Sequence, residues 1–422
     1  MTKAGRVARS ASDALAKHQA YGWAIADQAV SSAGNLLLMS QLSRSMGSNS
    51  FGRIASVYAV VMIGVAVVRA LFTEVINSAI ADEQQRKSAD RHARILTFML
   101  VALTLTVGII AIGLRGSDVA ALLLCTLPLL LIQDRLRFEW IYRGKTKNAF
   151  LMDGLWLVTQ CTLLAVVAPS LLSPSSTQAV VAWGVGAISS TVIAHRIGGP
   201  YHLGASLHWG RKMLGASSAL AMQSLVVNVA AYGPLFIFAV LGYADWSAGY
   251  LAASSILGIQ AATLVAIRPL IYRNFALMTE GISLERIAKI SIVVATLSLT
   301  IGALGIAVLA LFGTKIYGAT AHLALVISVW IAITRSLGSV CSVLNGVLRS
   351  TSSWSATLTG EVVSVVVAFT LMIGFGEAFG PRLISPAQTI AAVCSLMVWV
   401  TLVARIRRNQ TPYPLIDEEQ QK

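Results

Sequence analysis

Long apolar stretches recur along the whole chain, and short polar, mostly basic segments separate them. Each stretch has about the 20 residues that an α-helix needs to cross the hydrocarbon core of a bilayer. Twelve such stretches predict twelve transmembrane helices, at residues 22–43, 54–76, 95–114, 118–134, 150–170, 178–196, 213–241, 247–270, 288–312, 319–338, 355–376 and 385–404.

The composition agrees with this pattern. Hydrophobic residues make up 56% of the 422 residues and charged residues only 12%, whereas soluble domains carry about 25% charged residues. A soluble chain this apolar would have too little polar surface to cover itself. We therefore expect an all-α polytopic membrane protein whose apolar surface faces lipid.

The net charge of +14 does not indicate a nucleic-acid partner, because the basic residues lie between the apolar stretches and form no basic domain. Of the 32 Lys and Arg residues, 26 fall in segments that would be cytoplasmic if the N-terminus is inside, and five fall in outside loops. This asymmetry follows the positive-inside rule. It predicts a membrane protein with both termini in the cytoplasm.

No pattern for covalent chemistry is present. Gly144-Lys145-Thr146 ends like a phosphate-binding loop, but Glu139 occupies the position of the required glycine and no strand precedes it. The four cysteines are isolated and the histidines form no metal-binding motif. We expect no enzyme, no cofactor and no metal site, so transport would be secondary or downhill.

The chain divides near the Gly- and His-rich stretch 198–210. The two halves begin alike, because Asp27-Gln28 with Asn35 resembles Met222-Gln223 with Asn228. Six crossings per half would give both halves one orientation, related by a pseudo-two-fold axis along the membrane normal, with a cavity between them. The expected segments are a cytoplasmic N-terminal segment (1–21), a six-helix bundle (22–200), a cytoplasmic linker (201–212), a second six-helix bundle (213–404) and a cytoplasmic tail (405–422).

Polar residues inside apolar spans are costly and are the first candidates for function. Arg69 and Asp27 lie about 8–9 Å from the cytoplasmic ends of their spans, counted along the helix. They would face a shared inward-open cavity, or else pair with each other and snorkel. Arg268 would bind a headgroup at the mouth of the cavity, or else snorkel to the interface.

Further candidates have two interpretations each. Gln28, Asn35, Gln223 and Asn228 would bind substrate or form interhelical hydrogen bonds. Glu361 would couple transport to a proton or cation, or pair with Arg349 or Arg335, and Asp27 is a second coupling candidate. Gly233-Pro234 would act as a hinge or as a static kink. The basic and aromatic stretch 133–154, with Asp134, Arg137 and Asp153, would anchor the chain in the headgroup layer or form a cytoplasmic gate.

Two spacings resemble a known family. Arg44-x-x-Gly47-x-x-x-Phe51-Gly52 is similar to the segment between the first two spans of polysaccharide flippases in the multidrug/oligosaccharidyl-lipid/polysaccharide (MOP) exporter superfamily. Asp134-x-x-Arg137 with Asp153-x-x-Trp156 resembles a stretch after the fourth span in bacterial members. The motifs cover about 50 residues, and the length and paired halves agree along the whole chain.

The resemblance implies a V-shaped pair of bundles that moves a polyprenyl-diphosphate-linked oligosaccharide to the outer leaflet of a bacterial inner membrane. Arg69 and Arg268 match cationic cavity positions of the related lipid II flippases, but the first span carries Asp27 and no arginine before Arg44. This departure favours another glycolipid. The partners would be membrane lipids and the lipid-linked glycan, with a polymerase or glycosyltransferases nearby, and the protein would be a monomer. The alternatives are a multidrug antiporter and a non-transporting scaffold of a polymer-assembly complex.

Overall fold

The computed structural model describes most of the chain, and all of the described part with regular structure is helical. The expected third span at 95–114 and the candidate residue Arg268 lie outside the described residues. The described residues are 3–71, 119–142, 145–167, 174–198, 207–261, 263, 283–350 and 354–409.

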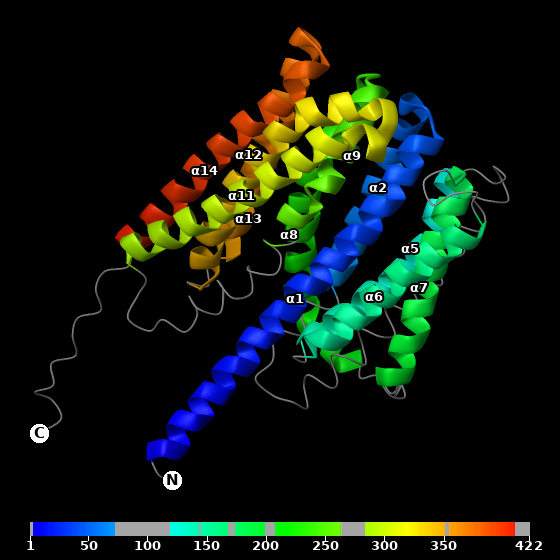
Figure 1. Cartoon of the computed structure of the whole chain (residues 1–422). Coiled ribbons are helices and arrows are strands. Elements are labelled where there is room, and N and C mark those ends of the chain that lie inside the picture. The colour runs from blue at the N-terminus through cyan, green and yellow to red at the C-terminus, as the bar shows by residue number, and fades with distance from the viewer. Residues whose placement is uncertain are drawn as a thin grey trace, which may run out of the picture.

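The helices follow the apolar stretches closely (Figure 1). In the first half they are α1 (Lys3–Ser45), α2 (Ser48–Arg69), α5 (Val119–Tyr142), α6 (Thr146–Val167) and α7 (Ser176–Gly198). In the second half they are α8 (Leu207–Val240), α9 (Ala244–Ile256), α11 (Leu284–Tyr317), α12 (Ala321–Ser350), α13 (Trp354–Phe379) and α14 (Ile384–Asn409), with the 3₁₀ turns η2 (Gly318–Thr320) and η3 (Pro381–Leu383).

The described helices are long and apolar enough for a multi-span membrane protein. Eight stretches of the described chain meet the length and hydropathy of a membrane span, and the longest, Leu284–Leu348, covers both α11 and α12. Large apolar side chains lie on the outer surface, such as Val166 at 77% exposed and Leu311 at 72%. Water would disfavour this surface, whereas lipid tails do not, so the surface fits a bilayer.

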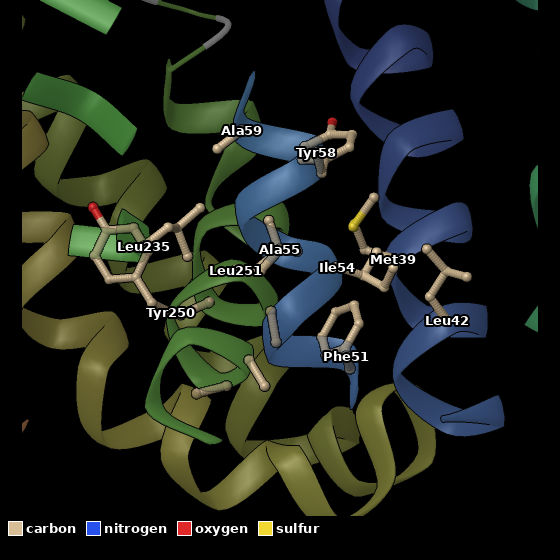
Figure 2. Close-up of a cluster of buried hydrophobic side chains, with 14 of the residues drawn as sticks. Met39, Leu42, Phe51, Ile54, Ala55, Tyr58, Ala59, Leu235, Tyr250 and Leu251 are labelled. Carbon is tan, nitrogen blue, oxygen red and sulfur yellow. The ribbon is translucent and has the colours of Figure 1, made fainter. Parts of the chain in front are cut away.

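Helix α2 lies between the two halves. Figure 2 shows Met39 of α1 beside Ile54 on one side of α2, and Leu235 of α8 and Leu251 of α9 beside Ala55 on the other. Ala55 is fully buried, as are the small side chains that pack around it: Ala59 on α2, and Ala248 and Ala252 on α9. Small residues let helix backbones approach closely, which is how membrane helices gain packing energy. Helix α2 therefore belongs to the first half and packs along α8 and α9 of the second.

Three helices extend further than the apolar pattern indicated. Helix α1 begins at Lys3, so residues 3–21 of the expected N-terminal segment belong to the same helix as the first predicted span. Helix α5 continues to Tyr142, which leaves only residues 143–145 between it and α6 in place of a loop over 135–149. Helix α12 continues to Ser350, past the predicted end of the span at 338, so Arg335 lies in the middle of the helix and not at its end.

Gly233 and Pro234 lie inside α8, which runs unbroken from Leu207 to Val240. An added Cβ at Gly233 would meet the ring of Phe369 on α13 at 2.9 Å, so this glycine allows a close helix contact. The hinge role of the pair stays a prediction, as do the division into two six-helix bundles and their pseudo-symmetry.

Candidate functional site

A buried ionic cluster joins α1, α5 and α6 around Arg137. The guanidinium of Arg137 donates to Oδ2 of Asp27 on α1 from Nε (2.9 Å) and Nη2 (2.7 Å). Its Nε also lies 3.1 Å from Oδ2 of Asp153 on α6. Asp27 and Asp153 are 0% and 1% exposed. The cluster therefore holds three helices together and is shielded from the surface.

The spacing of residues on α5 explains this geometry. Gln133 and Arg137 are four residues apart and share one face of the helix, where Gln133 Nε2 donates to Oδ1 of Asp153 at 2.5 Å. Asp134 and Phe138 share the neighbouring face, which meets α2. These contacts place Asp134, Arg137 and Asp153 inside the first half of the protein.

Arg69 pairs with Asp134 and not with Asp27. Its Nε donates to Oδ2 of Asp134 at 2.8 Å and its Nη2 to Oδ1 at 2.5 Å, the two-pronged geometry typical of arginine and carboxylate. The guanidinium also stacks over the ring of Phe138, 4.1 Å from the centroid. The arginine expected to line a shared cavity with Asp27 is thus neutralised by a carboxylate of its own half.

The cluster around Arg137 is not balanced. Two carboxylates, Asp27 and Asp153, face one guanidinium, and Oδ1 of Asp27 has no hydrogen-bond partner among the described residues. A hollow about the size of one water molecule lies beside Asp153, lined also by Ser31 and Asn35. Within the described residues no group of three His, Cys, Asp or Glu side chains could hold a metal ion.

The second half contains a different kind of buried cation. Arg335 lies in the middle of α12, and its Nη1 donates to the carbonyl of Leu257 at 2.5 Å, while its Nη2 donates to Oγ of Ser254 at 2.6 Å. Weaker contacts reach the carbonyl of Ser254 at 3.3–3.4 Å. In the described part of the chain, none of its partners is a carboxylate.

The backbone of α9 explains why Arg335 binds there. The helix ends at Ile256, passes through a turn at Leu257 and resumes at Gly258. The last carbonyls of a helix lack intrahelical partners and carry a partial negative charge, so they attract a cation. Arg335 therefore stabilises a broken helix, but the carbonyls offset only part of its charge.

Tyrosines lie between Arg335 and the first half of the protein. Tyr232 of α8 is close enough to interact electrostatically with both Arg335 and Arg69, and Tyr58 of α2 is close to Tyr232. Counted along α12 from Ala321, Arg335 lies about 21 Å from the end of the helix, and a hydrocarbon core is about 30 Å thick. This cation with its tyrosines is the candidate binding site.

The other predicted polar residues lie apart from Arg335. Asn228 donates to the carbonyl of Ser224 at 2.8 Å, and Ser224 Oγ donates across the two halves to the carbonyl of Ala66 at 3.0 Å. Gln223 is buried, Gln28 is half-buried, and Asn35 lines the hollow beside Asp153.

Glu361 of α13 accepts a hydrogen bond from Asn345 of α12 at 3.1 Å. It therefore contacts an amide, while the guanidinium of Arg335 reaches α9 instead. Arg335 therefore does not pair with Glu361. The side chain of the other expected partner, Arg349, lies outside the described ones, and the coupling role of Glu361 stays a prediction.

The sequence pattern missed Arg335 because the predicted span 319–338 ended three residues after it, which placed Arg335 at the cytoplasmic end of the span. A signal was available. Val343, Leu344, Val347 and Leu348 continue the apolar face with helical spacing, and all four are buried. Extending the helix through them would have placed Arg335 at its centre.

No protein-family model and no curated relative matches the sequence. Solved structures do match over nearly the whole chain. An inward-facing multidrug resistance MATE family transporter of the MOP superfamily has a TM-score of 0.69 at 12% identity, with 92% of this chain and 100% of that chain covered. The outward-facing conformation of such a transporter has a TM-score of 0.65 at 11% identity, covering 93% and 96%.

A third structure, a MOP superfamily transporter from Pyrococcus furiosus, is described as having a binding pocket of reverse polarity that suggests a different function. Its TM-score is 0.64 at 12% identity, with 93% of this chain and 96% of that chain covered. At this identity the likeness concerns the fold alone. The chain is a multi-span membrane protein, helical throughout the regular structure of its described part, with a fold like that of MATE transporters.

Proposed function

We propose that the protein is a flippase that moves an anionic lipid-linked glycan from the inner to the outer leaflet by alternating access. The substrate would be a polyprenyl-diphosphate-linked oligosaccharide or a related glycolipid used in envelope polysaccharide assembly. The protein would be a monomer in the bacterial plasma membrane, with both termini cytoplasmic, near a polymerase or glycosyltransferases. The MOP transporter fold supports the transport class, and the chemistry of Arg335 supports the charge of the substrate.

Arg335 is the observation on which the substrate class rests. A guanidinium at the depth of the hydrocarbon is costly unless a counter-charge is nearby. Its described partners, the carbonyls of Ser254 and Leu257 and the hydroxyl of Ser254, are all neutral. An anionic headgroup supplies the missing charge, and arginine binds phosphate oxygens with two parallel hydrogen bonds that lysine cannot reproduce.

The ion pairs of the first half move the proposed anion site away from Arg69. Because Asp134 already accepts two hydrogen bonds from Arg69, a diphosphate would have to compete with a carboxylate for that guanidinium. At Arg335 it would compete only with neutral oxygens. Tyr232, close to both arginines, would then contact the substrate between the halves. The lipid tail would stay in the bilayer.

The membrane potential is a sufficient driving force for this substrate. Each elementary charge that crosses gains about 2.3 kcal/mol per 100 mV. A dianion leaving a negative interior would therefore release roughly 4–5 kcal/mol per 100 mV if it crosses uncompensated. A coupling cation is then not required.

The experiment asks which leaflet holds the lipid-linked glycan. Cells depleted of the protein should accumulate it in the inner leaflet, and expression of the natural chain should restore export. Arg335→Gln should lose at least about tenfold of that export, since 1.4 kcal/mol of lost binding already corresponds to tenfold. Arg335→Lys should recover only part of the export, because lysine keeps the positive charge but cannot form the two parallel hydrogen bonds of a guanidinium.

Arg53→Gln is the matched control, because Arg53 is exposed on α2. It should export normally. Membrane levels of each variant must equal those of the natural chain. Normal export by a well-expressed Arg335→Gln variant would reject the proposed site, and normal glycan distribution in depleted cells would reject the flippase and favour a scaffold.

A proton-coupled multidrug antiporter is the second candidate. It is favoured by the excess of carboxylate over guanidinium around Arg137, since a buried uncompensated carboxylate tends to hold a proton. Increased drug susceptibility of a deletion strain, together with normal glycan distribution, would select this candidate instead.

A further inference from the structure

Four side-chain hydrogen bonds join the two halves at one end of the molecule, where α1 meets α2 (upper right in Figure 1). Ser43 Oγ donates to the carbonyl of Tyr317 at 3.0 Å and to Oγ1 of Thr320 at 3.1 Å. Arg44 Nη1 donates to the carbonyl of Lys315 at 2.8 Å. Ser48 Oγ donates to Oδ1 of Asp245 at 2.5 Å. The donors belong to the first half and every acceptor belongs to the second.

Gly52 packs directly against the backbone of the second half at this end. An added Cβ there would overlap the backbone carbonyl oxygen of Ala244, at the start of α9. Because the obstacle is backbone and not a flexible side chain, a larger residue could be accommodated only by moving α2 away from α9. Gly64 on the same helix is different, since its added Cβ would meet only a methyl group of Leu127 at 3.9 Å.

These residues are the motif Arg44-x-x-Gly47-x-x-x-Phe51-Gly52 that the sequence analysis singled out. Arg44 reaches across to α11, Gly47 begins α2 in an extended conformation with φ −62° and ψ 154°, and Phe51 is fully buried against the core. Gly52 then fits against α9. The motif therefore has a role in this structure, which is to close one end of the interface between the halves.

We propose that residues 43–52 form the outer gate of the transporter and that Gly52 sets how tightly this gate closes. The positive-inside pattern assigns the α1–α2, α8–α9 and α11–α12 connections to the outside, so this structure would be sealed toward the exterior.

The contacts suit a gate that opens in each cycle. Arg44 and Asp245 are exposed, so water can replace their partners when the halves separate. Alternating access needs one end to open while the other closes. The gate rests on the proposed transport cycle but not on the identity of the substrate, so its test uses none.

The test measures how fast a cysteine beneath the gate is labelled from outside. Leu251→Cys is the reporter, because Leu251 of α9 is 2% exposed and faces α2 (Figure 2). The four native cysteines, Cys125, Cys161, Cys341 and Cys394, are free and are first replaced by alanine. Asn49→Cys, at an exposed position on α2, gives the reference rate. The reagent is a membrane-impermeant maleimide, applied to intact cells or to inside-out vesicles.

We expect the reporter to label at least about tenfold more slowly than Asn49→Cys in the chain with the natural gate. Gly52→Ala should raise the reporter rate about tenfold, and Arg44→Ala should raise it less. Gly64→Ala and Arg53→Ala, the matched controls on α2, should leave the rate within about twofold. If Gly52→Ala does not accumulate in the membrane, Arg44→Ala and Ser48→Ala decide the question.

Equal labelling of all variants would overturn the proposal, because closure would then not depend on these contacts. An equal rise of the reporter labelling rate in Gly64→Ala would also overturn the proposal, because the rise would then reflect a general loosening of the protein and not the contact at Gly52. A rise seen only in inside-out vesicles would overturn the assignment of the gate to the outside. If the variants label as expected but depleted cells show a normal glycan distribution, the gate is supported and the proposed substrate is rejected.

Discussion

Removing the charge of Arg137 should destabilise the protein more than removing any exposed charge. In Arg137→Met the carboxylates of Asp27 and Asp153 would lose the guanidinium that lies 2.7 Å and 3.1 Å from them. Both carboxylates are at most 1% exposed, so water cannot replace it. Breaking a buried ion pair by removing one partner costs about 3–5 kcal/mol, because the other charge stays buried.

The loss can be expressed as a change in melting temperature. An unfolding entropy of roughly 2.1 cal/mol/K per residue gives about 0.9 kcal/mol/K for 422 residues. A loss of 3–5 kcal/mol then lowers Tm by about 3–6 °C. Arg69→Met should lower it less, because the side chain of Arg69 is 22% exposed and solvent screens the carboxylate left behind.

The assay is thermal unfolding of the purified protein in one detergent at one protein concentration. The decisive control is the triple variant Asp27→Asn, Asp153→Asn, Arg137→Met, which removes all three charges together. It should recover most of the lost stability, since the cost comes from uncompensated charge and not from the missing volume. This electrostatic reasoning would be refuted if Arg137→Met had the same Tm as the natural chain, or if the triple variant had a Tm no higher than that of Arg137→Met.

Two further predictions concern stability. Gly186→Ala should cost about 1–3 kcal/mol of stability, because an added Cβ would overlap Trp156. Gly154→Ala, with open space around it, should be neutral or stabilising by up to about 1 kcal/mol. Equal melting temperatures of the two variants would contradict this packing. Ser283→Ala should cost about 1 kcal/mol, because Ser283 Oγ accepts the backbone N–H of Arg286 at the start of α11; an unchanged Tm would show that this cap is dispensable.

The fold was predictable because lipid imposes a simple rule on sequence. A helix that crosses hydrocarbon needs an uninterrupted apolar stretch, and eleven of the expected spans contain helix in the described structure. The ends of helices were harder to predict. Arg135 and Arg137 resemble loop residues in sequence, yet α5 continues through them because carboxylates from other helices neutralise Arg137.

The site was only partly predictable for the same reason. Sequence shows that Arg69, Asp27 and Asp153 are polar residues near apolar stretches, but pairing depends on which helix faces meet. Asp134 and Arg137 are three residues apart, and each binds a different helix. Helical spacing within α5 could suggest two faces. It could not tell which face meets α2 and which meets α1 and α6.

The length of α1 has a mechanical consequence. Its 43 residues span about 65 Å at 1.5 Å per residue, roughly twice the thickness of a hydrocarbon core. Its C-terminal end is held by the hydrogen bond of Ser43 to the carbonyl of Tyr317, and its N-terminal end projects past the other helices (Figure 1). A tilt of about 10° around the fastened end would swing the far end by about 11 Å. A small rotation of the helix therefore displaces its N-terminal end by a large distance. A spin label near that end would report the rotation as a large change in its distance to a second label on the other helices.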